Sequence, residues 1–250
     1  MDETGVDGWL SRFSFVSNDP QFRLESQRVA TSLVRDINVH NVFGWRETAR
    51  TVPGGTRVYP YLHETKKRAI GQAVNLQIAM SSEYIRTLPE KIARKIAKDI
   101  ECARSQGATE KGCLNILRKE VVTNLVRRVN LLAQTDPHRI NSALTEARSD
   151  DLALHCFIWS TSKDSVVRHS HKKMEGVVVF WRDLPSPELL IGQPANLGYY
   201  APGNCPNCRC NAIPIISIDE LFKDPKSRIR VYVDNQIRML TKGQFIKLLD

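Results

Sequence analysis

The feature that most constrains the fold is a change of hydrophobic pattern near Leu154. Before this residue, apolar side chains recur at the spacing of three and four positions that buries one side of a helix. After it come short runs rich in β-branched and aromatic residues, bounded by Gly, Pro, Asn and Asp, which are typical of strands. These runs cover 156–159, 177–181, 212–216 and 229–233. Helices followed by strands predict an α+β fold.

We expect several separate helices in the first half of the chain. Their expected ranges are 20–34, 64–80, 109–117 and 121–132. A loop at 51–55 contains a proline and two glycines, which break any regular element.

Two prolines are interpreted as helix starts. Thr87 and Glu90 match a capping box, and Pro89 would stand in the first turn, where a missing N–H costs nothing. The helix that follows would end at Gly107, and its buried stripe repeats every four residues at Ile92, Ile96 and Ile100. By the same reasoning, Asp136-Pro137 predicts the start of a further helix.

The second half is expected to be a small mixed β region with a final helix over 241–249. Pro214 should lie at an edge of the sheet, because it cannot donate a ladder hydrogen bond. The chain would then consist of a mainly helical region, 1–150, and an α+β module with a cysteine-rich loop, 151–250.

Composition narrows the class of protein. The chain has 42% hydrophobic and 25% charged residues, which is ordinary for a folded soluble protein. No apolar run approaches the ~20 residues that span a bilayer, so we expect no membrane partner. The acidic N-terminus differs from a secretory signal and predicts folding in a cytoplasm. The net charge of +9 favours contact with nucleic acid or another acidic surface, or marks a soluble protein that happens to be basic.

The cysteines suggest a local site. Of six, three follow one another closely at Cys205, Cys208 and Cys210, unlike a framework of spaced disulfides. The two thiolates of a Cys-x-x-Cys pair can coordinate one Zn²⁺, and Cys210 offers a third thiolate. His169 and His171 alternate, so on a strand they would share one face and either would complete four ligands.

A polar clamp explains the same residues without chemistry. Asp164 and Arg168 would form a charge-assisted pair that ties a loop to the sheet. His171 would donate to a backbone carbonyl, and the cysteines would act as small buried hydrophobes. Gly176 and Gly203 would then be turn glycines.

Catalysis is the third interpretation. Asp164, His171 and Cys208 supply a carboxylate, a base and a nucleophile by type. A match of types over ~45 residues says little without geometry, so we expect no enzyme.

The order of these residues resembles the phage Mu F-like and SPP1 gp7-like family of head morphogenesis (minor head) proteins. The resemblance covers 155–216, and the helices before it are similar to the helical region of the family, whereas residues 1–60 match nothing recognisable. The matching positions are Trp159, Thr161, Ser162, Asp164, Arg168, His171, Gly176, Pro202, Gly203, Asn207, Cys208, Arg209, Cys210 and Pro214.

The resemblance implies a minor, non-enzymatic component of a tailed-phage head. It implies the portal protein and head or scaffold proteins as partners, with the helical half as the docking region. It also implies a place in the head interior of the virion, reached from the host cytoplasm during assembly, and a part in packaging, holding or delivering DNA. Two features depart from the family pattern: the inserted Cys205-Pro206 and the additional His169.

Basic residues of the helical half would contact DNA phosphates without sequence specificity, or would form solvated helix faces. An alternative function is a metal-dependent nuclease or hydrolase acting on nucleic acid, and another is a plain zinc-stabilised DNA-binding protein. The candidate DNA contacts are Arg94, Lys95, Lys98, Arg127 and Arg128, with Arg118 and Lys119 near them.

Overall fold

The computed structural model describes residues 5–52, 54–63, 69–224 and 226–249. Internal contacts divide the chain into two compact units. Unit 1 comprises Met1–Val34 and Leu76–Ala133, and unit 2 comprises Arg35–Asn75 and Gln134–Asp250. The separate roles expected for 1–150 and 151–250 stay a prediction.

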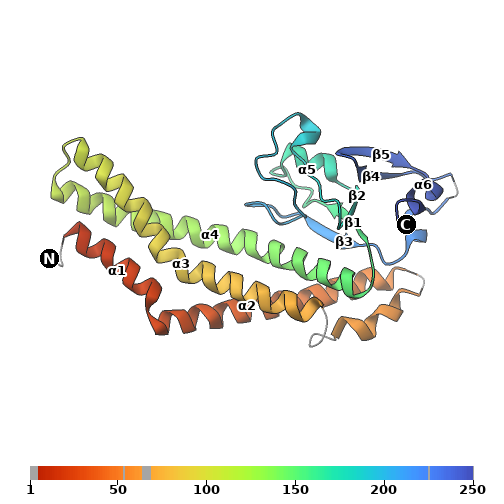
Figure 1. Cartoon of the computed structure of the whole chain (residues 1–250), viewed down its shortest axis with the longest axis horizontal. Helices are drawn as coiled ribbons and strands as arrows, with labels where there is room; N and C mark the ends of the chain where they lie inside the picture. Colours follow the sequence, from red (N-terminus) through yellow and green to blue (C-terminus); the bar gives the residue numbers. More distant parts are fainter. Residues whose placement is uncertain (1–4, 53, 64–68, 225, 250) are drawn as a thin grey trace. The chain divides into compact units, whose positions relative to one another are not determined.

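Long helices dominate the chain before the first strand (Figure 1). The predicted helical region is confirmed, but its helices are fewer and longer than expected, since 109–117, 121–132 and the segment from Asp136 form one helix. Residues 64–68, where another helix was expected to begin, lie outside the described residues. The helices are α1 (Val6–Asn18), α2 (Pro20–Arg50), α3 (Ala69–Ser105) and α4 (Glu110–Asp151), with a short 3-10 helix η1 (Gly55–His63) after α2.

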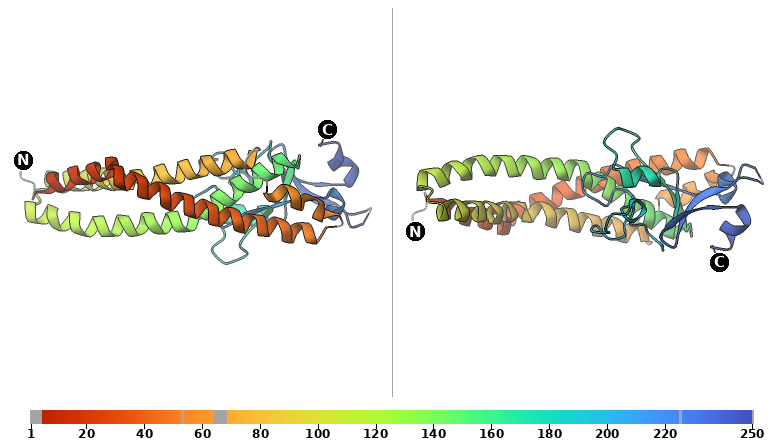
Figure 2. Two further views of the ribbon diagram at one scale, coloured as in Figure 1. Left: turned by 90° about the horizontal axis from the view of Figure 1, so that it is seen from below. Right: turned by 90° about the horizontal axis from the view of Figure 1, so that it is seen from above.

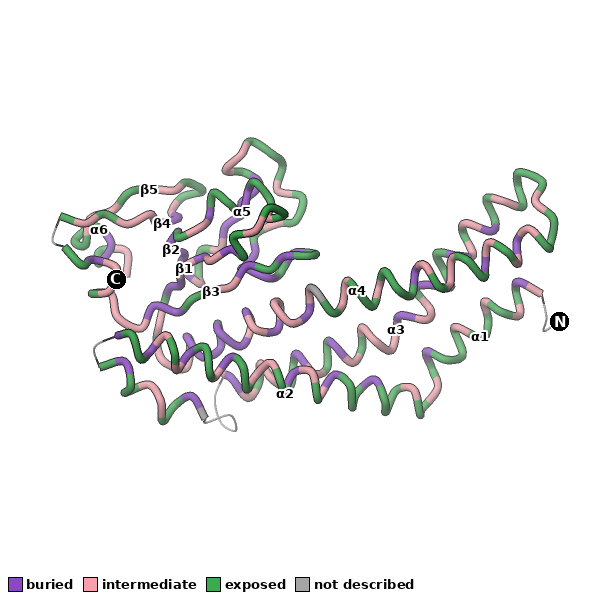
Figure 3. The backbone as a smooth tube through the Cα atoms, turned by 180° about the vertical axis from the view of Figure 1, so that it is seen from behind, coloured by how far each residue is buried: buried purple, intermediate pink, exposed green. Residues whose placement is uncertain are grey.

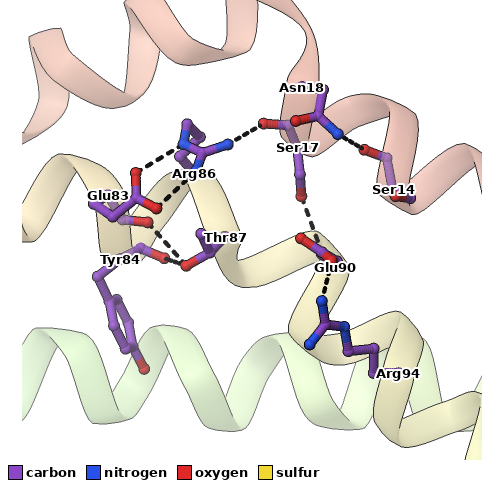
Figure 4. Close-up of polar contacts among 9 residues, drawn as sticks. All are labelled: Ser14, Ser17, Asn18, Glu83, Tyr84, Arg86, Thr87, Glu90 and Arg94. Atoms are coloured by element: carbon purple, nitrogen blue, oxygen red, sulfur yellow. Dashed lines mark hydrogen bonds and ion pairs between the residues drawn. The ribbon is translucent and has the colours of Figure 1, made fainter.

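Pro89 lies inside α3 and does not begin a helix, so that prediction was wrong. A proline inside a helix removes one N–H and crowds the preceding turn. The neighbouring N–H of Glu90 is donated to Ser17 Oγ of α1 at 3.1 Å, and Arg86 donates to the Ser17 carbonyl at 2.9 Å (Figure 4). Thr87 forms no cap, because its hydroxyl donates to the carbonyl four residues before it. Hydrogen bonds from α1 therefore help α3 to continue through the proline.

Pro137 likewise lies inside α4. The turn around it receives the cysteine-bearing loop: Asn207 N donates to Thr135 Oγ1 at 3.0 Å, and His138 Nδ1 lies 3.3 Å from Asn211 Oδ1. Gly203 packs so closely here that an added Cβ would lie 2.6 Å from the His138 carbonyl oxygen. Only glycine allows this approach at a φ of +85°.

The predicted isoleucine stripe of α3 is confirmed as the centre of the core of unit 1. Ile92, Ile96 and Ile100 are each at most 3% exposed. They pack with Val6 of α1 and with Cys113 and Leu117 of α4.

Unit 2 contains a five-stranded mixed sheet of order β3-β1-β2-β4-β5. The β2–β4 pair is parallel and the other neighbours are antiparallel. With the helices before it and a short helix after it, the sheet confirms the α+β class. The strands are β1 (Cys156–Ser160), β2 (Val178–Phe180), β3 (Asn211–Pro214), β4 (Ile229–Val233) and β5 (Gln236–Leu240).

The two faces of the sheet bury different side chains, because successive residues of a strand point to opposite sides. On one face Phe157, Trp159 and Tyr232 pack with the cysteines of the loop before β3. On the other, Val178 and Val231 pack with residues of the C-terminal segment.

Several details at the end of the chain agree with expectation. Pro214 closes β3, which is an edge strand. The final helix is present but shorter than the expected 241–249: α6 spans Lys242–Ile246, and Thr241 before it forms a capping box with Gln244. Phe245 of α6 is buried in the second core, and α6 lies beside the last strands in both views of Figure 2.

None of the described helices is long and apolar enough to cross a membrane.

Candidate metal centre

His171 lies at the centre of the site and is 2% exposed. It belongs to α5 (His169–Met174), the short helix between β1 and β2. The Trp159 ring meets the imidazole edge-on, with 5.5 Å between centroids, and the Tyr200 ring lies on another side. Aromatic packing therefore fixes the plane of the imidazole inside the module.

Three thiols surround the imidazole. Nδ1 lies 3.6 Å from Cys208 Sγ and 3.4 Å from Cys210 Sγ, and Nε2 lies 3.8 Å from Cys205 Sγ. One ligand atom from each of His171, Cys205 and Cys208 lies within 4.8 Å of the others. The structure thus brings together residues that stand up to 39 positions apart.

The thiols share their protons unequally. Hydrogen bonds from Cys205 and Cys210 lower the pKa of Cys208. The same hydrogen bonds, with burial, raise the pKa of Cys205 and of Cys210. The cluster therefore favours a thiolate at Cys208, the charge state in which sulfur binds metals.

Two further donors point at the sulfurs. The backbone N–H of Gly203 donates to Cys208 Sγ at 3.3 Å, and Arg168 Nη1 donates to Cys205 Sγ at 3.3 Å. Arg168 Nη2 also donates to the carbonyl of Pro206 at 2.9 Å, which holds the tip of the loop. N–H groups directed at sulfur stabilise negative charge on it.

The outer side of the imidazole is bonded to a buried polar chain. His171 Nε2 lies 2.9 Å from Tyr200 Oη, which donates to Glu188 Oε1 at 2.8 Å. Ser170 Oγ is 3.4 Å from the same carboxylate oxygen. Burial and the Glu188 carboxylate raise the pKa of Tyr200, so the phenol keeps its proton. A protonated Nε2 leaves the lone pair of Nδ1 directed at Cys208 and Cys210.

These residues fit a zinc ion. Zn–S bonds of ~2.3 Å and Zn–N bonds of ~2.0 Å at tetrahedral angles place a sulfur and a nitrogen ligand about 3.5 Å apart. The two distances from Nδ1, 3.6 and 3.4 Å, match this edge. The hydrogen-bonded chain behind Nε2 is the outer support that metal-binding histidines usually have. The buried group of His171, Cys205 and Cys208 can hold a metal such as zinc.

His169 was an alternative fourth ligand on the assumption of a strand, and that assumption was wrong. Both histidines lie on α5, where two positions correspond to about 200° around the axis. His171 faces inward and His169 is exposed.

The expected ion pair between Asp164 and Arg168 is replaced by another. Asp164 Oδ2 lies 2.7 Å from Arg209 Nη2, while Arg168 contacts Cys205 and Pro206. The carboxylate that reaches His171, through Tyr200, is Glu188. The arrangement imagined for catalysis, with Asp164 orienting the histidine, is therefore absent from these contacts.

The remaining motif residues line or support the site. Ser162, Arg168, Asn207 and Arg209 line an open cavity of about 610 Å³ beside His171, Cys208 and Cys210. Gly176, at a φ of +70°, donates its N–H to the Trp159 carbonyl at 2.9 Å. Asn207 takes a left-handed φ of +57° in the turn between Cys205 and Cys208.

Sequence reasoning missed three supporting residues. Tyr200 and Glu188 form the chain behind His171. Glu175 accepts hydrogen bonds from Thr161 N and Oγ1 at 2.6 and 2.7 Å. Only the position of Tyr200, five residues before Cys205, gave any signal in the sequence.

The candidate DNA contacts lie on helices. Arg94 pairs with Glu90, and Lys95 Nζ donates to Asn124 Oδ1 at 2.8 Å. Lys98 and Arg127 are exposed and Arg128 is half-buried. Their contact with DNA stays a proposal.

Comparisons with known proteins place part of the chain in a family. Residues 94–213 match the family model described as Phage Mu protein F like protein. An uncharacterized protein of Haemophilus influenzae (strain ATCC 51907 / DSM 11121 / KW20 / Rd) is 26% identical over 151 residues, which are 60% of this chain and 31% of that protein. The chain thus covers less than a third of the relative it matches. No solved structure matches the chain.

Proposed function

Residues 94–213 belong to the Phage Mu protein F-like family, and from this premise we propose that the protein is a minor head protein of a tailed bacteriophage, acting in head morphogenesis. The observation that supports this best is the match of residues 94–213 to that family, and the motif residues of the matched segment gather in a single buried cluster of His171 and the cysteines of one loop. A module closed in this way suits a rigid part of an assembled particle.

The metal centre has a structural role in this proposal. The ligands of a Zn²⁺ ion would be His171, Cys205 and Cys208, which form the three-residue group, with Cys210, whose Sγ lies 3.4 Å from His171 Nδ1, as the proposed fourth. The bound ion would cross-link α5 to the cysteine-bearing loop. Four protein ligands fill a tetrahedral zinc site and leave no position for a reacting water. With Cys210 as the fourth ligand, the site favours a non-enzymatic protein over a metal-dependent nuclease, which needs an open coordination position.

The helical region, residues 1–150, would dock to the portal protein or to head and scaffold proteins. Its basic residues, including Arg94, Lys98 and Arg127, would contact packaged DNA through phosphates, without sequence specificity and with strong dependence on salt. The protein would act inside the head, after assembly in the host cytoplasm.

Location tests the head assignment. A tagged copy of the gene, expressed during growth of the phage that carries it, should leave the protein in purified virions and DNA-free heads. A protein found only in the lysate, and in neither particle, would contradict a head component.

Metal content and activity test the role of the centre. Protein purified without added metal should contain about one zinc per chain, and Cys208→Ser should lower this content. The wild type, Asp164→Ala and His171→Ala should all lack nuclease activity. Hydrolysis of DNA by the wild type that both variants lose would support the enzyme instead.

A further inference from the structure

The part of α4 that belongs to unit 1 carries an apolar surface that faces solvent. Val122, Leu125, Val126 and Val129 are 62%, 47%, 52% and 47% exposed. Their spacing of three, four and seven places them on one side of the helix, and we call them the α4 stripe. In Figure 3, exposed residues recur along this part of α4.

The opposite side of the same helix is buried: Cys113 and Leu117 lie in the core of unit 1, and Asn124 follows them along this side. Asn124 is 5% exposed, accepts a hydrogen bond from Lys95 Nζ at 2.8 Å and donates to Glu120 Oε2 at 2.9 Å. The buried side of α4 therefore already contributes to the core of unit 1, while a second row of aliphatic side chains faces water. A helix that buries one apolar side normally presents polar side chains to water on the other, so the α4 stripe is shaped for contact with another molecule.

The charge around the stripe indicates what that molecule is. Residues 111–133 contain five basic side chains and one acidic one, a net charge of +4. Arg118, Lys119 and Arg127 are exposed, and the first two lie one helical turn before Val122. An apolar stripe beside positive charge is complementary to a helix with apolar residues along one side and carboxylates at its margins.

The other occupants fit less well. A nucleic acid would use the arginines and lysines, but four aliphatic side chains gain nothing from phosphates. A second copy of this chain would bring a second excess of positive charge to the same contact.

We propose that the α4 stripe is the docking site for an acidic amphipathic helix of a partner protein. The inference rests on the docking role proposed for the helical region, and it names the surface and the chemistry of the partner. It also reassigns Arg118 and Lys119 from DNA contact to the margin of a protein interface.

Synthetic helices test the inference with the full chain. The probes are a fluorescent peptide with leucines on one side and glutamates at the margins, the same peptide with lysines in place of glutamates, and a scrambled acidic peptide. The full-length protein should bind the first peptide at least about 10-fold more tightly than either of the others.

Two variants locate the contact. Val122→Ser/Val126→Ser should weaken binding of the acidic helix about 10-fold or more, and Arg118→Glu/Lys119→Glu should shift the preference toward the lysine peptide. Leu24→Ser/Val29→Ser is the matched control, because these α2 residues are also exposed, 44% and 54%, and should leave binding unchanged. Circular dichroism checks that each variant keeps its helices.

Three results would overturn the inference. One is that the protein binds the acidic and the lysine peptides equally tightly, or binds neither of them. Another is binding of duplex DNA that depends on Arg118 but not on Val126, which would return this surface to nucleic acid. The third is a dimer in sedimentation that only the stripe variant loses, which would assign the surface to a second copy. Each concerns the stripe alone, whereas absence of the protein from virions concerns the head assignment.

Discussion

Arg209 Nη2 lies 2.7 Å from Asp164 Oδ2, and this ion pair joins the loop after β1 to the cysteine-bearing loop. Arg168 is thereby left to contact Cys205 and Pro206. Both loops that line the open cavity are thus held by arginines: Arg209 joins one loop to the other, and Arg168 binds the tip of the cysteine-bearing loop.

The exposure of the pair limits what it contributes. Its side chains are 42% and 35% exposed, so solvent screens their attraction. Asp164→Asn should lower the free energy of unfolding by only about 0.5–1 kcal/mol in urea denaturation. A double-mutant cycle with Arg209→Met should give a coupling energy of similar size. A coupling energy indistinguishable from zero would show that the pair does not join the loops.

Removal of the Tyr200 hydroxyl should weaken zinc binding. Tyr200→Phe breaks the chain from His171 Nε2 to Glu188, and loss of such outer contacts usually costs 10–100-fold in metal affinity. Competition with a chromogenic chelator measures the affinity. Tyr199→Phe is the control, since Tyr199 is 59% exposed, and should leave affinity unchanged. Equal affinity of the Tyr200→Phe protein and the wild type would remove the hydroxyl from the support of the histidine.

Gly203→Ala should lower the free energy of unfolding more than Gly198→Ala, the same change at another glycine of positive φ. The new methyl group would lie 2.6 Å from the His138 carbonyl oxygen at a φ of +85°. Strain and crowding together should cost about 3 kcal/mol in chemical denaturation. Gly198→Ala shares the positive φ but meets nothing within 4 Å, so it should cost about 1 kcal/mol. An equal decrease in the free energy of unfolding for both variants would mean that the loop does not pack closely against α4.

The contacts of Glu175 should make the free energy of unfolding fall as the pH is lowered. Burial raises the pKa of Glu175, but hydrogen bonds from Thr161 and the nearby Lys163 outweigh it and lower that pKa overall. Since the folded pKa lies below the unfolded value of about 4.3, the stabilisation is present above that value and is lost as pH falls through the folded pKa. Glu175→Gln should therefore be less stable than the wild type at pH 6, and the difference should shrink by pH 3.

Glu220 provides a control of opposite sign, because burial raises its pKa. The free energy of unfolding of Glu220→Gln should fall between pH 6 and pH 3 at least as much as that of the wild type. Urea denaturation across this range measures both variants, and a gap for Glu175→Gln that stays constant from pH 6 to pH 3 would contradict the assigned contacts.

The sequence alone predicted four of the five strands and the main residues of the cluster around His171. Four β-branched or aromatic runs became β1 to β4, because such runs bounded by turn residues have few alternatives. Strand β5 was missed, since three of its five residues are exposed and it shows little alternation. Its signal was the turn at Asp234 and Asn235, both at positive φ, which joins it to β4.

Long-range contacts account for most of the errors. Pro89 reads locally as a helix start, and only Ser17, 73 positions away from Glu90, explains why the helix continues. The exchange of partners between Arg168 and Arg209 depends likewise on how two loops meet. His171 was chosen for its place in the motif, but its support by Tyr200 and Glu188 depends on folding of the segment between β2 and β3.

The edges of the sheet bear on behaviour at high concentration. Strand β3 has four residues and closes on Pro214, which offers no N–H to a neighbour, and β5 carries the charged Arg238. Short, proline-ended or charged borders resist pairing with strands of other molecules. Crowded copies of this chain should therefore not join through the edges of their sheets to form fibres.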